Sequence, residues 1–291
     1  MQGQRLIFWI LFDISSPLIR IILKLDDLPM TLSFIDIHAK DNNKVKHLRG
    51  LCEQANYRKK QQQTVLEGVH LIEAYLKTGK PVNAFYLTRQ ALENMEVQQL
   101  LDQLSGLPVY VLTDSLYQDI RTLGPGIDIM AVIDTPSSPA EINQNSDMLV
   151  LENLQDPGNV GTLLRTAAAA GIKQIICSTG TAAIWSPRVL RAGMGAQFSL
   201  SIFEHVALKT LIPTLSLPVY ATSSHAQQSL YQLDLKQPCI WLMGNEGQGI
   251  SENLLQHAQG IAIPQPGGQE SLNVAIAGAI CLFEMVRQRL T

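Results

Sequence analysis

The chain has 291 residues, of which 46% are hydrophobic and only 16% are charged. This composition excludes an intrinsically disordered chain, and the length is sufficient for two domains of ordinary size, each with its own core. The net charge of −3 at pH 7 does not by itself indicate a nucleic-acid partner. The four cysteines lie far apart and form no CxxC pair, which argues against a zinc site or a disulfide framework and predicts a reducing, cytoplasmic environment.

The first residues of the chain differ in character from the rest. An apolar run over residues 6–12 is faintly similar to the core of a signal peptide. The run is short, no small-residue cleavage site follows it, and Asp13 and Arg20 interrupt any stretch long enough to cross a bilayer. We therefore expect no membrane association, and we expect residues 1–29 to be an extension upstream of a start at Met30 rather than a helix that touches a membrane.

Residues 30–134 have the pattern of a compact α/β unit that begins with a helix and then alternates helices and strands. Residues 64–68 predict a strand that turns into an amphipathic helix over residues 69–76. Further strands are expected at residues 85–88, 108–112 and 129–133, with a helix over residues 90–104 between the first two.

A stretch with several Pro, Ser and Asn residues, 135–147, is the best candidate for a linker. After it, apolar strands alternate with helical stretches. The expected strands are residues 148–151, 174–178, 219–222, 240–243 and 261–263. Such alternation predicts an α/β fold with a parallel sheet covered by helices on both faces.

Three polar, glycine-containing motifs follow the ends of three of these strands. They are residues 152–161, 242–251 and 263–274, and Arg165 comes shortly after the first. In α/β folds the loops after the carboxyl ends of the strands form the ligand sites. None of these motifs contains G-x-G-x-x-G after a strand, so the sequence does not support a Rossmann-type site.

At these motifs the chain resembles the SpoU (TrmH-type) RNA ribose 2′-O-methyltransferases of the SPOUT class, and the motifs occur in the order of that family. The resemblance implies a methyltransferase domain over residues 148–291, C-terminal loops threaded into a trefoil knot, S-adenosylmethionine as the methyl donor, and a homodimer formed through this domain. Residues 30–134 resemble the small L30e-like domain with which many members bind RNA, mainly through residues 65–68 and the strand order. This domain type implies ribosomal RNA of the 23S type ahead of transfer RNA.

In the family the backbones of the second and third motifs wrap the methyl donor. The resemblance places Gly244, Ile263 and Leu272 at positions that contact it, and we assign Thr222, at the end of a predicted strand, to the same site. Glycines allow positive φ angles and close approach of the backbone to a ligand. An ordinary strand-to-helix turn would explain one such motif equally well, but three in order favour the donor site.

Arg165 stands among alanines of a predicted helix and could simply extend into solvent. Together with Asn159, six residues earlier across the turn, it becomes a candidate for the RNA-facing side of the pocket. In the family this arginine is the residue most closely tied to catalysis. A guanidinium is a poor base, because it holds its proton strongly in proteins, so we expect it to position and polarise the ribose 2′-hydroxyl.

Three further polar residues are candidates for the active site. Glu246 either accepts backbone N–H groups in a tight turn, or it orients Arg165 or Asn159, or it steers the nucleophile. Ser271 is expected to cap the C-terminal helix. Asn273 is expected just inside that helix, where a side-chain task is favoured because Asn is a poor helix former. The resemblance assigns both of these residues to the active site.

RNA contacts are expected from local charge. Residues 40–60 hold seven basic side chains against two acidic ones. Such a run is usually a solvated helix face, but beside a methyltransferase site we expect it to hold phosphates, with Tyr57 available for base stacking. The expected phosphate-binding residues are Lys44, Lys46, Arg49, Arg58, Lys59, Lys60 and, in a second segment, Arg188. The family often has Ser where Gly193 stands, which leaves no clear direct role for position 193.

The C-terminal helix, expected over residues 272–290, is apolar on nearly every side, which predicts burial within its own domain or against another chain. Two other functions stay open: a non-catalytic RNA-binding protein on the same fold, and a SPOUT enzyme that methylates a base nitrogen. Retention of the polar residues in all three motifs argues against the first. A dedicated acid in place of the Asn and Arg residues would be expected for the second.

Overall fold

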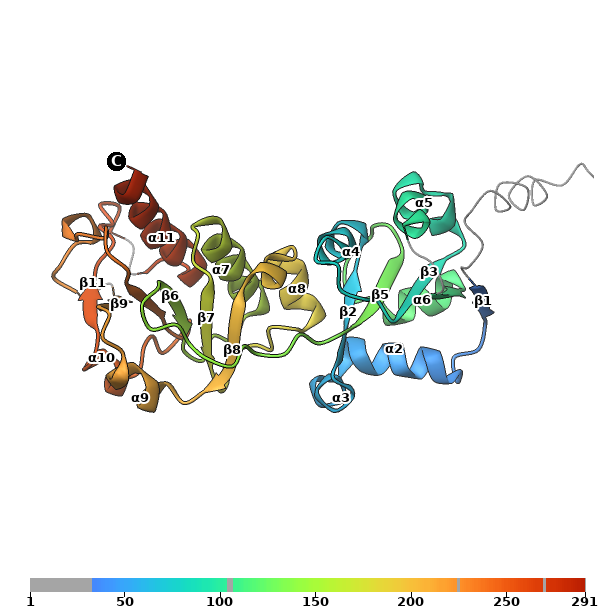
Figure 1. Ribbon diagram of the computed structural model, residues 1–291, viewed down its shortest axis with the longest axis horizontal. Coiled ribbons are helices and arrows are strands. Elements are labelled where there is room, and N and C mark those ends of the chain that lie inside the picture. The colour runs from blue at the N-terminus through green and yellow to red at the C-terminus, as the bar shows by residue number, and fades with distance from the viewer. Residues whose placement is uncertain (1–32, 104–106, 224–225, 269–270, 291) are drawn as a thin grey trace, which may run out of the picture.

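The computed structural model describes residues 33–103, 107–223, 226–268 and 271–290. Its elements form two α/β lobes arranged end to end (Figure 1). We call the elements from β1 to β5 the N-terminal lobe and those from β6 to α11 the C-terminal lobe. The expected extension, residues 1–29, lies outside the described residues.

The N-terminal lobe is built on a five-stranded mixed sheet with the strand order β1-β4-β3-β5-β2. β1, β4 and β3 are parallel, whereas β5 runs antiparallel to both β3 and β2. The elements are β1 (Ser33–Ile37), α2 (Asn43–Glu53), α3 (Ala55–Gln61), β2 (Gln63–Glu67), α4 (Val69–Leu76), β3 (Ala84–Thr88), α5 (Met95–Asp102), β4 (Pro108–Leu112), α6 (Asp114–Ile120) and β5 (Ile129–Asp134). The four predicted strands and the helix over residues 69–76 are confirmed.

Two predictions for this lobe were wrong in part. The first described element of the lobe is the edge strand β1, not a helix, since β1 pairs along its whole length with β4. The expected helix over residues 90–104 is divided at Asn94. The side chain of Asn94 accepts hydrogen bonds from the N–H groups of Glu96 and Val97, which caps α5 and leaves the separate 3-10 turn η1 (Gln90–Glu93) before it.

Two hydrophobic cores lie on opposite faces of this sheet. α2 and α6 cover one face, and α4 and α5 cover the other. Alternate residues of each strand point into the two cores. In β3, for example, Tyr86 packs beneath α2 and α6, and Phe85 and Leu87 pack beneath α4 and α5. The core beneath α4 and α5 also includes Leu190 of the C-terminal lobe, so the two lobes share buried surface.

The C-terminal lobe is built on a six-stranded parallel sheet with the strand order β11-β9-β10-β6-β7-β8. Its elements are β6 (Met148–Leu151), α7 (Pro157–Ala169), β7 (Gln174–Ser178), α8 (Pro187–Gly193), η2 (Ala196–Ser199), β8 (Ser201–Val206), α9 (Leu208–Leu211), η3 (Ile212–Thr214), β9 (Val219–Thr222), η4 (Leu230–Gln232), β10 (Ile240–Met243), α10 (Glu252–Leu255), β11 (Gln259–Ile261) and α11 (Val274–Leu290). α7 and α11 pack on one face and α9 and α10 on the other, which confirms the predicted sheet with helices on both faces.

Two strands of this lobe differ from expectation. β8 was not predicted, and the last strand lies two residues earlier than the expected 261–263. Beyond Ile261 the backbone turns to the segment before η4, where Ala262 donates to the carbonyl of Gln228 and accepts from the N–H of Leu230, both at 2.8 Å. The polar start of β11 hides it from a search for apolar runs. The trefoil knot stays a prediction of the resemblance.

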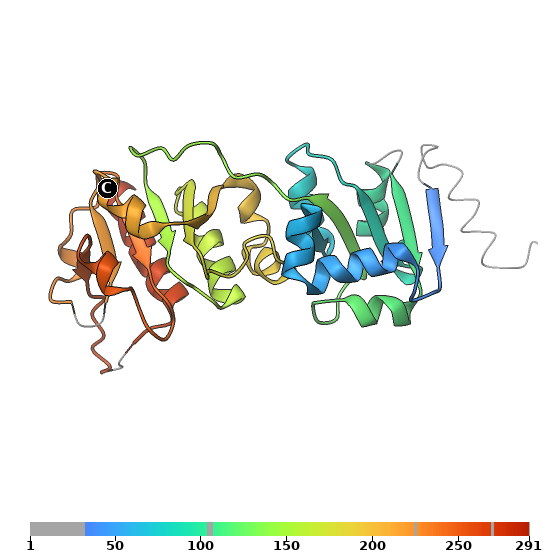
Figure 2. The ribbon, with the colours of Figure 1, turned by 90° about the horizontal axis from the view of Figure 1, so that it is seen from below.

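Residues 135–147 connect the lobes as an extended segment between β5 and β6 (Figure 2). None of the helices in the described residues has the length and hydrophobicity needed to span a bilayer. All four cysteines fall within the described ranges, and each is a buried, unpaired thiol.

Candidate active site

The direction in which successive strands are added reverses between β6 and β10. From β6 the chain moves outward to β7 and β8, then crosses to β9 on the other side before returning to β10. Leu151 at the end of β6 pairs with Met243 at the end of β10, so the loops after both strands begin side by side. Open α/β sheets bind ligands at such a switch point. The structure thus brings the first two sequence motifs together at this edge.

Glu246 links these two motifs. Its carboxylate accepts hydrogen bonds from the backbone N–H groups of Gln155 (3.3 Å) and Asp156 (3.1 Å) and from the side-chain N–H of Asn159 (3.2 Å). Among the described residues, Arg165 makes no hydrogen bond or ion pair with this carboxylate. Of the roles left open by the sequence, the geometry supports acceptance of backbone N–H groups and orientation of Asn159, and it does not support orientation of Arg165.

Asn273 adds the third motif to the same network. Its side-chain N–H donates to Oδ1 of Asn159 at 2.9 Å, and its own Oδ1 accepts from the N–H groups of Ala275 (2.9 Å) and Ile276 (3.2 Å). We call Glu246, Asn159 and Asn273 the amide relay. It joins three distant segments, since Glu246 and Asn273 follow Asn159 by 87 and 114 residues in the sequence.

The start of α11 differs from expectation. The helix begins at Val274, two residues later than expected, and the side chain that caps it is Asn273. The predictions that Ser271 caps this helix and that Asn273 lies inside it were therefore wrong. Ser271 is exposed in the loop just before the cap.

Asn159 and Arg165 both belong to α7, and the expectation that a turn separates them was wrong. Asp156 caps this helix by accepting the N–H of Asn159 at 2.7 Å, and Pro157 occupies the first turn, where no N–H is needed. Six residues within one helix are about 9 Å apart along its axis and about 120° apart around it. The two side chains therefore leave the helix in different directions, and that of Arg165 is exposed.

The network also affects the charge of Glu246. Partial burial acts to raise the pKa of its carboxyl group, but hydrogen bonds from its own N–H, the Asn159 side chain and the N–H groups of Asp156 and Gln155 outweigh this effect and lower the pKa. The group is therefore a carboxylate at neutral pH and acts only as an acceptor in the relay.

The second motif folds back on itself as a tight loop. Asn245 and Gly249 exchange two backbone hydrogen bonds of 2.9 Å. A Cβ on Gly244 would lie 2.5 Å from the backbone nitrogen of Ile250, so this position accepts only glycine. The side chain of Asn245 donates to the carbonyl of Asn153 in the first motif at 2.8 Å, a second link between the two loops.

Asn153 and Asn245 are positioning residues that the sequence analysis missed. Asn153 has a φ of 51°, in the left-handed region, and its N–H donates to Oγ of Ser178 at 2.8 Å. A signal was present in the sequence, because asparagine tolerates left-handed backbone better than other non-glycine residues, and each of the two comes two residues after the end of a predicted strand.

The four residues assigned to the methyl donor lie at or beyond the carboxyl ends of three neighbouring strands. Thr222 ends β9 and Gly244 follows β10, and Oγ1 of Thr222 is 3.8 Å from the sulfur of Met243. Ile263 follows β11 by two residues, and it and Leu272 are partly buried. Thr222, Gly244 and Ile263 therefore come from adjacent strand ends of one sheet.

Two of the residues expected to contact RNA have structural tasks instead. Nη1 of Arg58 donates to the carbonyl oxygens of Leu51 (2.8 Å) and Cys52 (3.2 Å), and burial lowers the pKa of its guanidinium. The Tyr57 ring packs against Gly50, where a Cβ would lie 2.7 Å from the ring, and is no free platform for base stacking.

The other basic residues of this segment remain at the surface. Lys46, Lys59 and Lys60 are exposed. Arg49 is 3.6 Å from the carboxylate of Glu53, and Lys44 lies 5.6 Å above the ring of Tyr110. Fewer cations of this segment are therefore free at the surface than the sequence suggested, and their contact with RNA stays a prediction.

The α8 region explains the glycine at position 193. A Cβ on Gly193 would lie 2.5 Å from Oε1 of Gln197, whose side-chain N–H donates to the carbonyl of Val189 at 2.9 Å. The buried Gln197 amide therefore occupies the space that a serine side chain would need. Arg188 on the same helix is exposed.

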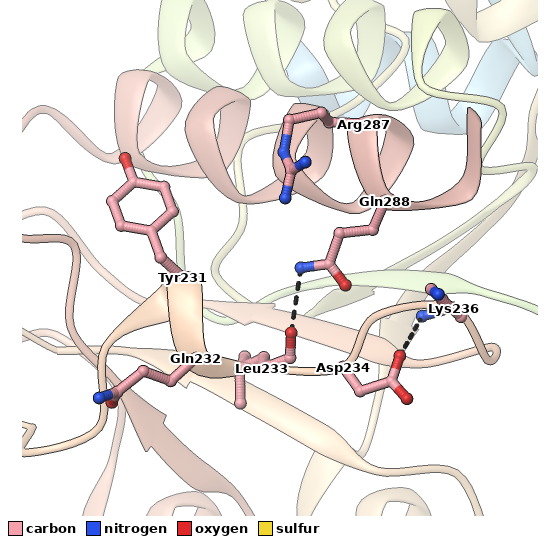
Figure 3. A pocket seen from close by; sticks show the side chains of 7 residues that line it. All are labelled: Tyr231, Gln232, Leu233, Asp234, Lys236, Arg287 and Gln288. Carbon is pink, nitrogen blue, oxygen red and sulfur yellow. Dashed lines mark hydrogen bonds between the residues drawn. The ribbon is translucent and has the colours of Figure 1, made fainter. Parts of the chain in front are cut away.

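A pocket of about 410 Å³ lies away from the three motifs, between η4 and the end of α11 (Figure 3). Tyr231, Arg287 and Gln288 are among the residues that line it, and the side-chain N–H of Gln288 donates to the carbonyl of Leu233 at 3.0 Å. Because this pocket shares no residue with the relay or with the strand ends, we do not assign the donor to it.

The switch point of a parallel sheet, framed by loops from both halves of that sheet, is the place where open α/β folds bind their ligands. Comparison with known proteins specifies the class. The SpoU rRNA methylase family model matches residues 147–283, and the model of the MRM3-like substrate binding domain matches residues 42–123. The chain belongs to the SpoU family of RNA methyltransferases.

Individual relatives agree with this assignment. An uncharacterized tRNA/rRNA methyltransferase of Synechocystis is 37% identical over 90% of this chain and 97% of its own length. The 23S rRNA (guanosine-2′-O-)-methyltransferase of Pseudomonas aeruginosa is 38% identical over 76% of this chain and 95% of its own. A crystal structure of AdoMet-bound rRNA methyltransferase from Sinorhizobium meliloti is 27% identical and covers 89% of this chain and 99% of its own, with a TM-score of 0.76.

The relay predicts a pH-dependent contribution of Glu246 to stability. In Glu246→Gln one carboxylate oxygen becomes an N–H₂ group that faces N–H donors. Because Glu246 is exposed and solvent screens its interactions, we expect a loss of only about 0.5 kcal/mol in the free energy of unfolding at pH 7. Because the pKa of Glu246 is lower in the folded state, its contribution is complete above the ordinary value of about 4.3 and is lost as pH falls through the lowered folded value.

Urea unfolding at a series of pH values measures this contribution. The difference between wild type and Glu246→Gln should be constant from about pH 6 to 8 and shrink on acidification below about pH 4. Glu141→Gln, at an exposed glutamate in the segment between the lobes, is the matched control and should show no such difference. Equal stability of Glu246→Gln and wild type at neutral pH would contradict the assigned role.

Proposed function

We propose that this chain transfers a methyl group from S-adenosylmethionine to a ribose 2′-hydroxyl of RNA, with ribosomal RNA ahead of transfer RNA as the substrate. The observation that carries the proposal is the amide relay, which holds the three motifs together at the switch point of the sheet. The rRNA methyltransferases among the relatives support the substrate class, and the AdoMet-bound structure from S. meliloti supports the donor.

The loops of the second and third motifs fit a donor that is held mainly by backbone groups. Apart from the chain neighbours, no atom of the described residues lies within 4 Å of the position that a Cβ would take on Gly249, Gly267 or Gly268, so a ligand can approach the backbone there. Bound S-adenosylmethionine supplies a methyl group on a positively charged sulfur. The residues that we assign to hold it are Thr222, Gly244, Ile263 and Leu272.

Methyl transfer by in-line displacement depends chiefly on alignment. Holding the reacting atoms at about 3 Å in the correct orientation contributes about 7–11 kcal/mol to lowering the barrier. The relay suits this task because it fixes the loops that would carry the donor. The Asn159 amide already uses its N–H toward Glu246 and its oxygen toward Asn273, so we assign all three a positioning role.

Arg165 is the residue that we place on the RNA. Its exposed guanidinium is free, within the described part of the chain, to contact a ribose hydroxyl and a neighbouring phosphate. A guanidinium stays protonated at neutral pH, so it polarises the hydroxyl while the proton leaves to phosphate or water. Ser271, exposed beside the relay, is a further candidate to contact the substrate.

We assign residues 30–134 to RNA binding, 135–147 to a linker and 148–291 to methyl transfer. Lys46, Lys59 and Lys60 are exposed cations of α2 and α3 that we assign to phosphates, with Lys44, Arg49 and Arg188 in support. Buried, unpaired cysteines suit a reducing compartment, and we place the protein in the cytoplasm, an assignment that cell fractionation tests.

We further infer a homodimer formed through α11. One side of this helix is buried in its own lobe, but Ile276 and Phe283 are 53% and 49% exposed, and the partly buried Ile280 lies between them. These residues are spaced i, i+4 and i+7 and so form one apolar stripe. A second copy of the chain would cover a stripe that is otherwise left in water.

The proposed activity predicts 2′-O-methylated nucleosides. Labelled S-adenosylmethionine is incubated with the protein and with rRNA and tRNA from cells that lack this gene, and the nucleosides are then analysed. Arg165→Ala should lower transfer by about a hundredfold or more, as expected for loss of a charged contact made at the reacting group, and leave donor affinity within a few-fold.

Lys173→Ala, an exposed cation elsewhere in the same lobe, is the control and should transfer like wild type. A label on a base nitrogen, or no label in either RNA class despite donor binding, would refute the proposed reaction. A large loss of donor affinity in Arg165→Ala would refute the role assigned to that residue.

Lys59 and Lys60 are expected to contribute to RNA affinity without selecting a sequence. The double variant Lys59→Ala/Lys60→Ala removes two phosphate contacts, so the slope of log K against log salt should fall in magnitude by about 1.4–1.8. Filter binding at several salt concentrations measures the slope. The control Lys77→Ala/Lys173→Ala removes the same charge from other exposed positions, and an equal change in both double variants would exclude a specific contact surface.

The stripe on α11 predicts the oligomeric state. Phe283→Glu places a charge in the proposed interface, so sedimentation velocity should show a dimer for wild type and a monomer for the variant. Met95→Glu alters an apolar side chain that is 71% exposed on the N-terminal lobe and should stay dimeric. A monomeric wild type, or a Phe283→Glu variant that remains dimeric, would exclude this interface.

A further inference from the structure

The two lobes are joined by packing and hydrogen-bond contacts in addition to the linker. We call residues 185–199, which include α8 and η2, the junction segment. Leu190 of this segment is fully buried within the core of the N-terminal lobe, beneath α4 and α5. Close by, Oγ1 of the fully buried Thr64 in β2 donates to the carbonyl of Trp185 at 2.5 Å. A buried side chain and a partly buried hydrogen bond therefore cross between the lobes.

A second set of contacts lies at the other end of the junction segment. The ring of Phe198 packs edge-on against Tyr75 of α4, with 5.1 Å between the ring centroids. Gly195 has a φ of 81°, and a Cβ there would lie 2.8 Å from the Cβ of Ala74. The backbone of the junction segment therefore touches α4 so closely that only glycine fits.

The junction segment is in turn packed against the helix that carries the candidate active-site residues. A Cβ on Gly161 of α7 would lie 2.7 Å from the backbone nitrogen of Gly193 and the carbonyl oxygen of Val189. Because both atoms belong to the backbone, α7 and α8 are in contact along their main chains. Asn159 and Arg165 stand on either side of Gly161 in the same helix.

We infer that the junction segment is a specificity-determining element: it fixes the N-terminal lobe relative to α7, and so sets the distance between the RNA held by that lobe and the ribose presented to Arg165. A linker of 13 residues alone would permit many separations. Because the junction segment holds the lobes at one separation, RNA bound to the N-terminal lobe presents a single nucleotide to the active site. This inference rests on the proposed function.

The test uses a pair of glycine substitutions with the same backbone strain. Gly195→Ala places a methyl group against Ala74 between the lobes. Gly171→Ala, at a φ of 84° and with none of the described atoms beyond its chain neighbours within 4 Å, adds the same strain without a contact. Gly195→Ala should raise the KM for RNA about tenfold, or about 1.4 kcal/mol, spread the methyl group over neighbouring nucleotides, and leave donor affinity and kcat within about threefold. Gly171→Ala should match wild type in all of these.

A structural readout keeps the test independent of activity. The natural cysteines are buried, so cysteines introduced at exposed Met95 on the N-terminal lobe and Thr210 on the C-terminal lobe can carry a fluorophore pair. Single-molecule energy transfer should give one narrow distance in wild type and Gly171→Ala and a broad distribution in Gly195→Ala. If Gly195→Ala does not fold, Phe198→Ala, which removes the contact with Tyr75, replaces it.

The outcomes separate the two proposals. A broad distance distribution in wild type, or equal RNA KM and equal site choice in Gly195→Ala and Gly171→Ala, would overturn the role of the junction segment. A wild-type protein that holds one distance but methylates no ribose would refute the proposed function and leave the fixed junction standing.

Discussion

One carboxylate and two amides hold together three segments that are distant in the sequence. An amide has one end that donates and one that accepts, so the direction of each hydrogen bond in the relay is determined: backbone N–H groups of α11 donate to Asn273, Asn273 donates to Asn159, and Asn159 donates to Glu246. The N-termini of α7 and α11 both lie at this network, and the positive ends of their dipoles favour an ionised Glu246. Replacing either amide by a carboxylate would place two acceptors face to face.

The parallel sheet, the order of its motifs and most of the strands were accessible from the sequence because they depend on local pattern. Apolar runs and Gly, Pro and Asn after strand ends show directly in the chain, and the strands at residues 148–151 and 240–243 were predicted at their observed positions. The strands that escaped prediction, β1 and β8, are edge strands held by a neighbour rather than by their own composition. The last strand, β11, was predicted two residues too late because it begins with a polar residue.

The roles of individual side chains were harder to predict, because they depend on what folding brings alongside them. Arg58 reads as a cation in a basic run, yet in the fold it satisfies two carbonyls at the end of α2. Asn273 reads as a residue inside a helix, yet it begins the helix and completes the relay. In the sequence, Gly193 suggests the loss of a serine hydroxyl. In the structure, the Gln197 side chain fills the space that a side chain at position 193 would need. The types of residue at the site could be predicted from the sequence, whereas their hydrogen-bond and packing partners could be identified only in the folded structure.

The place where α11 begins has a consequence for assembly. Asn273 caps the helix with the oxygen of its amide and completes the relay with the nitrogen, and the apolar stripe that we assign to the proposed dimer interface starts within the next turn. A partner that orders the first turn of α11 would thereby order the loops around the donor as well. In the proposed dimer, thermodynamic reciprocity would then make donor binding tighten the association of subunits by the same factor by which association tightens donor binding. The fraction of dimer would then depend on the donor concentration, and dilution of the protein alone would lower its affinity for the donor.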